Sequence, residues 1–192
     1  MRRLIPVTVL VLVLCLGSPL GLGHPLPALA AGACSVPSMS YPTIASALGD
    51  SSCTSISLAA GTFHEHGLTV TRNLTISGAG FRYTVVDGGA AGTGVFTVNS
   101  GVTAEIDNLQ VINGASTSDS TGGAISNHGS LTLKNDAFRQ DVFSGPSSGG
   151  GAVFSDGSQL TVVGGVFNGD SYSATSPGYP SGGGAIGIYG GI

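Results

Sequence analysis

The chain has 192 residues, of which 33 are glycine and only 8% are charged; its formal net charge is −4 and it has no tryptophan. The glycines follow no Gly-X-Y period, which excludes collagen, and an apolar content of 41% argues against a disordered chain. The six basic residues are too few and too scattered to form a nucleic-acid-binding patch.

Residues 1–30 are predicted to be a signal peptide. Arg2 and Arg3 precede a nearly continuous apolar stretch over 4–16, and Ala28-Leu29-Ala30 offers a small-residue cleavage site. An uncleaved membrane anchor is the alternative, which the prolines and glycines between residues 6 and 21 weaken. Cleavage removes two positive charges, so we expect a mature chain of net charge −6, secreted or held at the cell surface without membrane insertion.

Residues 31–54 are predicted to form an N-terminal cap. Its two cysteines, Cys34 and Cys53, are the only ones left after cleavage, and an even count in an exported protein favours a disulfide. A two-thiolate metal half-site is the alternative, but no further ligands lie at suitable spacing. Between the cysteines a short helix is expected over 41–49, ended by Gly49. Its apolar face is formed by Tyr41, Ile44, Ala45 and Leu48.

Residues 55–192 are predicted to be stacked coils. Strands are expected at 55–58 and 67–70, and then four similar segments start 28, 29 and 29 residues apart. They are Leu74-Thr75-Ile76, Val102-Thr103-Ala104, Leu131-Thr132-Leu133 and Leu160-Thr161-Val162. Such a period is typical of repeat architectures in which each repeat buries its apolar face against its neighbours.

Aligning these segments predicts which residues stack on successive coils. The alternation puts the aliphatic residues inside and the four threonines 75, 103, 132 and 161 in one outer column. Glu105 and Lys134 would be neighbours on adjacent coils. A further column would hold Leu109, Phe138 and Phe167, and turns would recur at Asn99-Ser100-Gly101, Asn127-His128-Gly129 and Asp156-Gly157-Ser158.

The expected fold is therefore all-β: a right-handed, single-stranded parallel β-helix with a short N-terminal capping helix. A leucine-rich repeat lacks its Leu-x-x-Leu-x-Leu frame here, and the glycine density excludes an α-solenoid. Gly184 predicts another strand near residues 192–193, so we expect the coils to be incomplete at the C-terminus, as in a truncated product.

Two known groups resemble this chain. The units Gly122-Gly123-Ala124-Ile125 and Gly183-Gly184-Ala185-Ile186, with Phe138-x-x-Asp141 and Phe167-x-x-Asp170, resemble the GGAI and FxxN repeats of polymorphic outer membrane proteins, with Asp in place of Asn. The segments 76–80 and 85–89 resemble early coils of pectin-lyase-like proteins. The resemblance implies an exported β-helix. Polysaccharide lyases and galacturonases share that fold, so the resemblance also raises the possibility of an enzyme.

Several residues are candidates for chemistry. Stacking is expected to bring Asp107 beside Asp136, and Asp141 beside Asp170, with Arg139 nearby. Paired carboxylates of this kind could bind Ca²⁺ or act as an acid and a base. The simpler interpretation, which we expect, is that these aspartates are turn residues. His64-Glu65-His66 is a possible metal half-site, for which an exposed turn is the simpler interpretation. A turn role is likewise expected for Asn127-His128-Gly129.

The sequence favours a secreted or cell-surface β-helix protein of structural or adhesive type, contacting a glycan or another surface component. The alternative is a polysaccharide-active enzyme, a lyase or glycoside hydrolase, or an inactive remnant of one. We expect no cofactor, no bound metal, no nucleic acid partner and a monomer; no catalytic residue is assigned.

Overall fold

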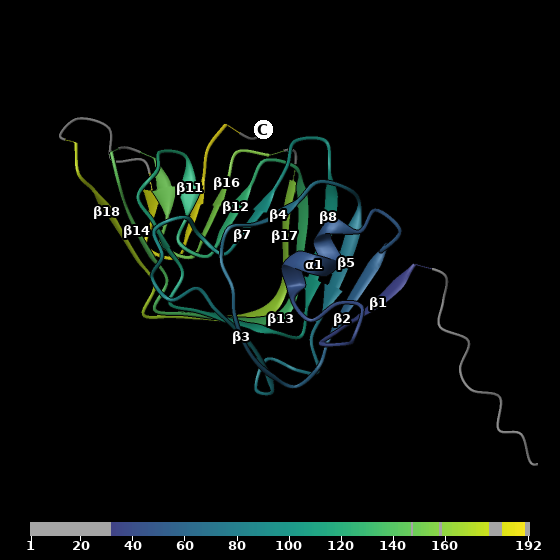
Figure 1. Cartoon of the computed structure of the whole chain (residues 1–192). Helices are drawn as coiled ribbons and strands as arrows, with labels where there is room; N and C mark the ends of the chain where they lie inside the picture. Colours follow the sequence, from purple (N-terminus) through teal and green to yellow (C-terminus); the bar gives the residue numbers. More distant parts are fainter. Residues whose placement is uncertain (1–31, 147, 158, 177–181, 191–192) are drawn as a thin grey trace, which may run out of the picture.

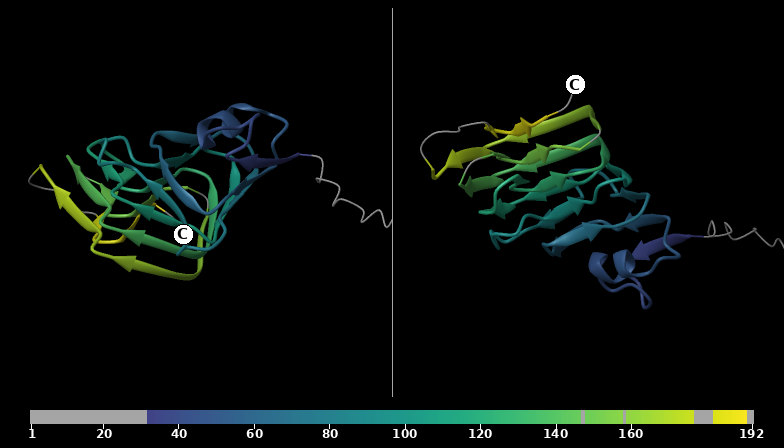
Figure 2. Two further views of the ribbon diagram at one scale, coloured as in Figure 1. Left: turned by 60° about the horizontal axis from the view of Figure 1, so that its bottom comes forward. Right: turned by 90° about the horizontal axis from the view of Figure 1, so that it is seen from above.

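A computed structural model describes residues 32–146, 148–157, 159–176 and 182–190. Its strands stack in parallel as a β-solenoid of about four turns. Figure 2 shows the strands following one another in sequence order, from the purple end beside helix α1 to the yellow end. The predicted signal peptide lies outside the described residues. No helix within the described part of the chain has the length and apolar character needed to cross a membrane.

Four parallel sheets form the walls of the solenoid. The largest holds β1 (Ala33–Val36), β2 (Ser55–Leu58), β5 (Leu74–Ser77), β8 (Thr103–Asp107), β13 (Ser130–Arg139), β9 (Gln110–Ile112), β6 (Thr84–Asp87), β3 (Gly61–His64) and β17 (Gln159–Asn168). A second holds β4 (Leu68–Val70), β7 (Phe96–Val98), β12 (Ile125–Asn127), β16 (Val153–Ser155) and β20 (Ile186–Ile188). The two smaller sheets are β10 (Ala115–Ser116), β14 (Val142–Gly145) and β18 (Ser171–Ala174), and β11 (Thr121–Gly122), β15 (Gly149–Gly150) and β19 (Gly182–Gly183).

The core is built from columns, by which we mean residues at equivalent positions on successive coils. One column holds Ile56, Ile76, Ile106 and Leu133, all at most 1% exposed. Burying each such side chain stabilises the fold by about 2 kcal/mol before conformational entropy is counted. The predicted alternation of inward aliphatic and outward polar residues is therefore confirmed for the three inner coils.

The predicted threonine column is wrong at one position. Thr103 pairs with Ser130, whereas Thr132 pairs with Glu105 on one side and Thr161 on the other. The predicted alignment of this strand is off by two residues, because Ala104 and not Val102 pairs with Leu131. A shift of two leaves every side chain on the same face of its strand, so the inward pattern alone does not detect it.

The same shift affects two other predicted columns. Phe138 pairs with Val111 rather than Leu109, and it stacks on Phe167 with ring centroids 4.9 Å apart. Asp107 pairs with Lys134 and not with Asp136. The segment 103–112 is therefore displaced by two residues relative to the alignment that the sequence suggested.

A narrow part of the solenoid lies between the two small sheets (Figure 1). Phe143 and Tyr172 stack here on successive coils, with ring centroids 5.3 Å apart. A Cβ atom on Gly149 would lie 2.5 Å from the Phe143 ring, and one on Gly182 would meet Tyr172 in the same way. Gly149 and Gly182 are therefore required to be glycine, because an aromatic ring occupies the space that a side chain would fill.

Helix α1 (Ile44–Gly49) covers the first coil, as predicted, and contacts β1, β2 and β4. It begins after Thr43, whose side chain forms a capping box with Ser46. Its buried residues are Ile44, Ala47 and Leu48, so the apolar face includes Ala47 rather than the predicted Ala45, which is exposed.

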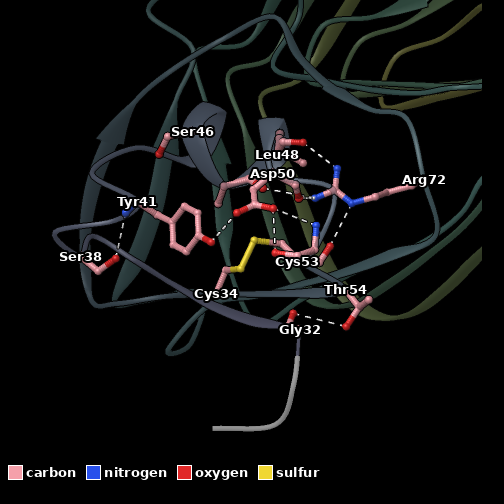
Figure 3. Close-up of a disulfide and its surroundings, with 12 residues drawn as sticks. Gly32, Cys34, Ser38, Tyr41, Ser46, Leu48, Asp50, Cys53, Thr54 and Arg72 are labelled. Carbon is pink, nitrogen blue, oxygen red and sulfur yellow. Dashed lines mark hydrogen bonds between the residues drawn. A yellow bond between two sulfur atoms is a disulfide. The ribbon is translucent and has the colours of Figure 1, made fainter.

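Three tertiary contacts hold this helix in place. The disulfide between Cys34 and Cys53 joins β1 to the segment after the helix, with both cysteines buried, as predicted (Figure 3). Glu65 accepts hydrogen bonds from the backbone N–H groups of Ile44 and Ala45. At the other end Arg72 donates to four carbonyl oxygens, those of Ala47, Leu48, Asp50 and Cys53. The negatively charged Glu65 thus lies at the N-terminus of the helix and the positively charged Arg72 at its C-terminus, which is the arrangement that the helix dipole favours.

Candidate functional site

Asp136 is a buried carboxyl group at a corner between two strand segments. It is 1% exposed, and its two oxygens accept hydrogen bonds from the backbone N–H groups of Leu109 and Lys134. Burial raises the pKa of Asp136 to about 7, and those two hydrogen bonds oppose the rise. Its contacts bridge two coils, which is a structural role.

Asp141 and Asp170 stack on adjacent coils, as predicted. The backbone N–H of Asp141 donates to Oδ1 of Asp170, and Oδ1 of Asp141 accepts from the N–H of Gly114 one coil earlier. Burial, and then the charge of Asp170, raise the pKa of Asp141 to about 8, and burial also raises the pKa of Asp170. Their Oδ2 atoms are buried and lack a hydrogen-bond partner in the described part of the chain.

These carboxyl groups are poorly placed for chemistry on a polysaccharide. Asp136 and Asp141 are 1% and 0% exposed, whereas Arg139 is exposed. A polymer lying on the surface would contact Arg139 without reaching either carboxylate. The structure therefore supports the turn role of these residues rather than an acid–base pair.

The segment His64-Glu65-His66 runs from the last residue of β3 towards β4 and contacts the capping helix through Glu65. Its central residue is the Glu65 that caps α1, while His64 lies 3.4 Å from Asp87 and His66 lies 3.2 Å from the hydroxyl of Thr93. Among the described residues no group of three or more potential ligands is arranged to hold a metal ion. No local sequence pattern indicates the capping role of Glu65, because that role depends on contacts across 21 residues.

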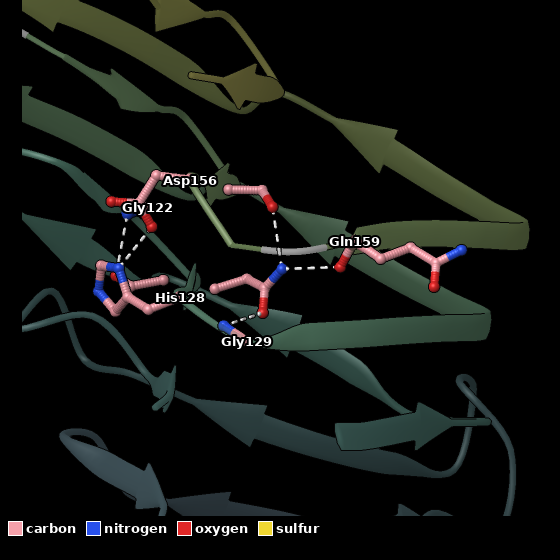
Figure 4. Close-up of polar contacts among 8 residues, drawn as sticks. Gly122, His128, Gly129, Asp156 and Gln159 are labelled. Carbon is pink, nitrogen blue, oxygen red and sulfur yellow. Dashed lines mark hydrogen bonds and ion pairs between the residues drawn. The ribbon is translucent and has the colours of Figure 1, made fainter. Parts of the chain in front are cut away.

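The turn at Asn127-His128-Gly129 links two coils. Asn127 is fully buried: it donates to the Ser155 hydroxyl and the Gln159 carbonyl, and accepts from the N–H of Gly129. His128 lies 2.6 Å from the carboxylate of Asp156 on the next coil (Figure 4). The expected turn role is consistent with these contacts.

A polar groove on the outer face of the large sheet is the best candidate for an external contact. It has a volume of about 450 Å³ and lies across β5, β8 and β13. Its polar lining comes from adjacent coils: Thr54, Asn73, Thr75, Thr103, Glu105 and Thr132. The two-residue register shift creates this lining, because it places Glu105 directly between Thr75 and Thr132.

Charge in this groove is balanced locally. The carboxylate of Glu105 lies 2.7 Å from the ammonium group of Lys134, so the predicted pair is confirmed, although it forms diagonally across the ladder. Asn73 accepts a hydrogen bond from the N–H of Thr103 through its side-chain oxygen. What remains for a ligand is mainly a row of threonine hydroxyls, which both donate and accept hydrogen bonds.

No family model, curated protein or solved structure matches this chain. The groove and the cap therefore have to be interpreted from their own chemistry.

A second cavity, of about 590 Å³, lies between α1 and the segment 66–72. Leu48 and Leu68 contribute apolar surface, and Arg72 lines it as well. The guanidinium group of Arg72 is already committed to the four carbonyls at the end of the helix. This cavity is therefore part of the cap and offers little charge to a ligand.

Proposed function

We propose that this chain is an exported β-solenoid of structural or adhesive type that binds a neutral glycan through the groove lined by Thr75, Glu105 and Thr132. The observation that supports this proposal is the row of hydroxyl groups on an outer face of the large sheet. The carboxylate among them, that of Glu105, is already paired with Lys134. Hydroxyls of this kind exchange hydrogen bonds with sugar hydroxyls without requiring charge on the ligand.

The proposal includes secretion or display at the cell surface, right-handed winding of the coils, and kinship with the repeats of polymorphic outer membrane proteins. The predicted leader and the Cys34–Cys53 disulfide support export, because disulfides persist in oxidising compartments. Right-handed winding is supported by the strong preference of parallel strand connections for that hand.

Turnover of a polysaccharide has less support, since the buried Asp136 and Asp141 are not accessible to a polymer. An enzyme would nevertheless release product from the glycan it binds. Binding that persists with no release of reducing or unsaturated ends therefore distinguishes the adhesive function from the enzymatic one.

A glycan array probed with the exported chain tests the proposal. Thr75→Val and Thr132→Val remove hydroxyls while keeping the shape and strand preference of the side chain. Together they are expected to weaken binding by about tenfold or more, at about 1 kcal/mol for each hydrogen bond lost. Thr62→Val, on exposed β3 away from the groove, is the matched control. Unchanged binding in the double variant would contradict the proposal.

A further inference from the structure

The turn between β5 and β6 presents three large side chains in a row, those of Phe81, Arg82 and Tyr83. Arg82 and Tyr83 are exposed, and Phe81 is partly exposed. Among the described aromatic residues that precede β17, only Tyr83 is exposed, because the others pack wholly or partly into the solenoid. An aromatic side chain that the core does not use is available for contact with a ligand.

Hydrogen bonds tie this turn to the coils on both sides. The N–H of Gly80 donates to the carbonyl of Asn108 on the next coil, and the Gly80 carbonyl accepts from the N–H groups of Tyr83 and Thr84. Thr84 is 0% exposed, and its hydroxyl donates to the carbonyl of Ala59 on the coil before. The backbone that carries the exposed side chains is therefore ordered before any ligand binds, which lowers the entropy cost of binding.

The ring of Tyr83 has a defined position on this turn. Gly80 has a φ of +133°, and a Cβ atom built on it would lie 3.1 Å from Cδ2 of Tyr83, so the ring rests against the Gly80 backbone. The rest of the side chain is open, since Tyr83 is 66% exposed. The face of an aromatic ring carries partial negative charge and attracts C–H groups such as those on one face of a sugar ring.

Arg82 supplies a positive charge beside that ring. Its guanidinium carbon lies 5.6 Å from the centre of the Phe81 ring, within the range of a cation–π contact. Arg72 is held by four carbonyls and Lys134 by Glu105, whereas Arg82 forms no ion pair with any described residue. Arg82 therefore keeps its planar set of N–H donors for a ligand, and that set matches the two oxygens of a carboxylate.

We infer that the turn 80–83 binds a sugar residue that carries a carboxylate. The carboxylate lies on Arg82 and the C–H face of the sugar ring on Tyr83. Consecutive Cα atoms are about 3.8 Å apart, so these two side chains reach both groups of one sugar. The ligand is a single terminal sugar, because the formal net charge of −4 disfavours a long anionic polymer. This site is separate from the groove and does not depend on glycan binding there.

Two other anionic partners fit the turn less well. An acidic peptide offers carboxylates, but these are on flexible side chains without a flat C–H face for the ring of Tyr83. An anionic membrane is held by clusters of several basic residues, and this turn has one, Arg82. A carboxylated sugar is the ligand that uses both neighbouring side chains at once.

NMR titrations of the exported chain with two pairs of ligands test the inference. Sialyllactose is compared with lactose, which lacks the acidic sugar. The methyl glycoside of glucuronic acid is compared with methyl glucoside, which lacks the carboxylate. At least one acidic ligand is expected to bind about tenfold more tightly than its neutral counterpart, because a hydrogen-bonded charge pair is lost in the latter. The pair that shows the difference identifies the source of the carboxylate.

Substitutions separate the two contacts. Arg82→Gln is expected to lower the affinity for the acidic ligand by about tenfold, because the charge and the paired donors are lost. Tyr83→Ala is expected to lower it by about fivefold, whereas Tyr83→Phe keeps the ring and should bind like the wild type. Arg139→Gln is the matched control. Arg139 is also exposed and unpaired among the described residues, but the aromatic residue beside it, Phe138, is buried.

Three results would overturn the inference. The first is that neither acidic ligand binds more tightly than its neutral counterpart. The second is an equal loss of affinity in Arg82→Gln and Arg139→Gln, which would place the contact elsewhere. The third is binding to phosphatidylserine vesicles, and not to phosphatidylcholine vesicles, without binding of either acidic sugar, which would make the turn a lipid contact.

Two controls keep these outcomes distinct from other failures. Circular dichroism of each variant shows whether it keeps its β structure, so that lost binding is not confused with unfolding. Arg82→Gln should leave unchanged any binding of neutral glycans that requires Thr75 and Thr132, because the groove and the turn are separate sites. Failure of the groove to bind glycans would therefore leave the result at the turn unaffected.

Discussion

The backbone N–H of Asp141 donates a hydrogen bond of 3.0 Å to the carboxylate of Asp170 on the next coil. Asp141 repeats the arrangement toward Gly114, so the same corner is held twice by a carboxyl group and a backbone amide. The Asp141 side chain is buried and that of Asp170 is half-buried, and a neutral acceptor would make the same bonds without the cost of burying charge.

This arrangement predicts a pH dependence of stability. Because the pKa of Asp141 is raised to about 8 in the folded protein, its carboxyl binds a proton more tightly folded than unfolded. Stability is therefore expected to fall as the pH rises from the unfolded pKa of about 4 to about 8. Asp141→Asn should raise the free energy of unfolding by about 1–3 kcal/mol at pH 8 and change it little at pH 4.

Urea unfolding at the two pH values measures this effect. Asp119→Asn, at an exposed aspartate whose Oδ1 accepts hydrogen bonds from the backbone N–H groups of Ser120 and Ser148, is the control and should leave the difference between the two pH values close to that of the wild type. An Asp141→Asn protein that loses stability at pH 8 would contradict the explanation.

Arg72 is expected to be essential for the cap. It makes four hydrogen bonds to carbonyl oxygens, and Lys cannot reproduce that forked geometry although it keeps the charge. Arg72→Lys should lower the free energy of unfolding by about 2 kcal/mol. Arg82→Lys, at an exposed arginine, should change it by less than about 0.5 kcal/mol. Equal effects of the two substitutions in urea unfolding would show that the carbonyl contacts contribute little.

The disulfide is expected to contribute through the unfolded state. It closes a loop of 19 residues, for which the chain-entropy relation gives about 3 kcal/mol. The double variant Cys34→Ala, Cys53→Ala should lose stability on that scale, measured by urea unfolding under non-reducing conditions. Mass spectrometry of the exported wild type provides the control, because a chain with the disulfide is lighter by two hydrogen atoms than a chain with two free thiols. A free thiol at either cysteine would refute the pairing.

The stacked rings between the small sheets make a prediction about glycine. Gly149→Ala should lower the free energy of unfolding by about 1–3 kcal/mol, because the new methyl group overlaps the Phe143 ring. Combining it with Phe143→Ala should give less than the sum of the two single effects, since the smaller side chain removes the clash. Gly49→Ala, which meets nothing within 4 Å, is the control and is expected to be neutral or stabilising.

Much of the fold could be predicted from the sequence because the apolar pattern and the fold have the same period. The β2 strand at Ser55–Leu58, the capping helix and the cysteine pair all follow from local patterns. The register of β8 could not be predicted, because pairing Thr103 with Thr132 or with Ser130 puts the same side chains inside. Only packing of whole coils decides between alignments that differ by two residues.

The candidate site was harder to predict for the same reason. The groove around Glu105 exists only in the correct register, and the roles of Glu65 and Arg72 arise from contacts with a helix more than 19 residues away. Asp141 and Asp170 were placed together correctly, since no shift occurs between their coils. The burial of Asp141 was not expected, because an aspartate in a polar turn sequence usually faces solvent.

The shifted register also shows that the fold tolerates coils of different length. Ala104 follows Leu74 by 30 residues, Leu131 follows Ala104 by 27, and Leu160 follows Leu131 by 29, yet all four occupy one column. The segments between the strands differ in length from coil to coil, while the paired strands keep the same residues aligned in columns. Insertions and deletions at the corners can therefore remodel the outer surface, and whatever it contacts, without rebuilding the interior.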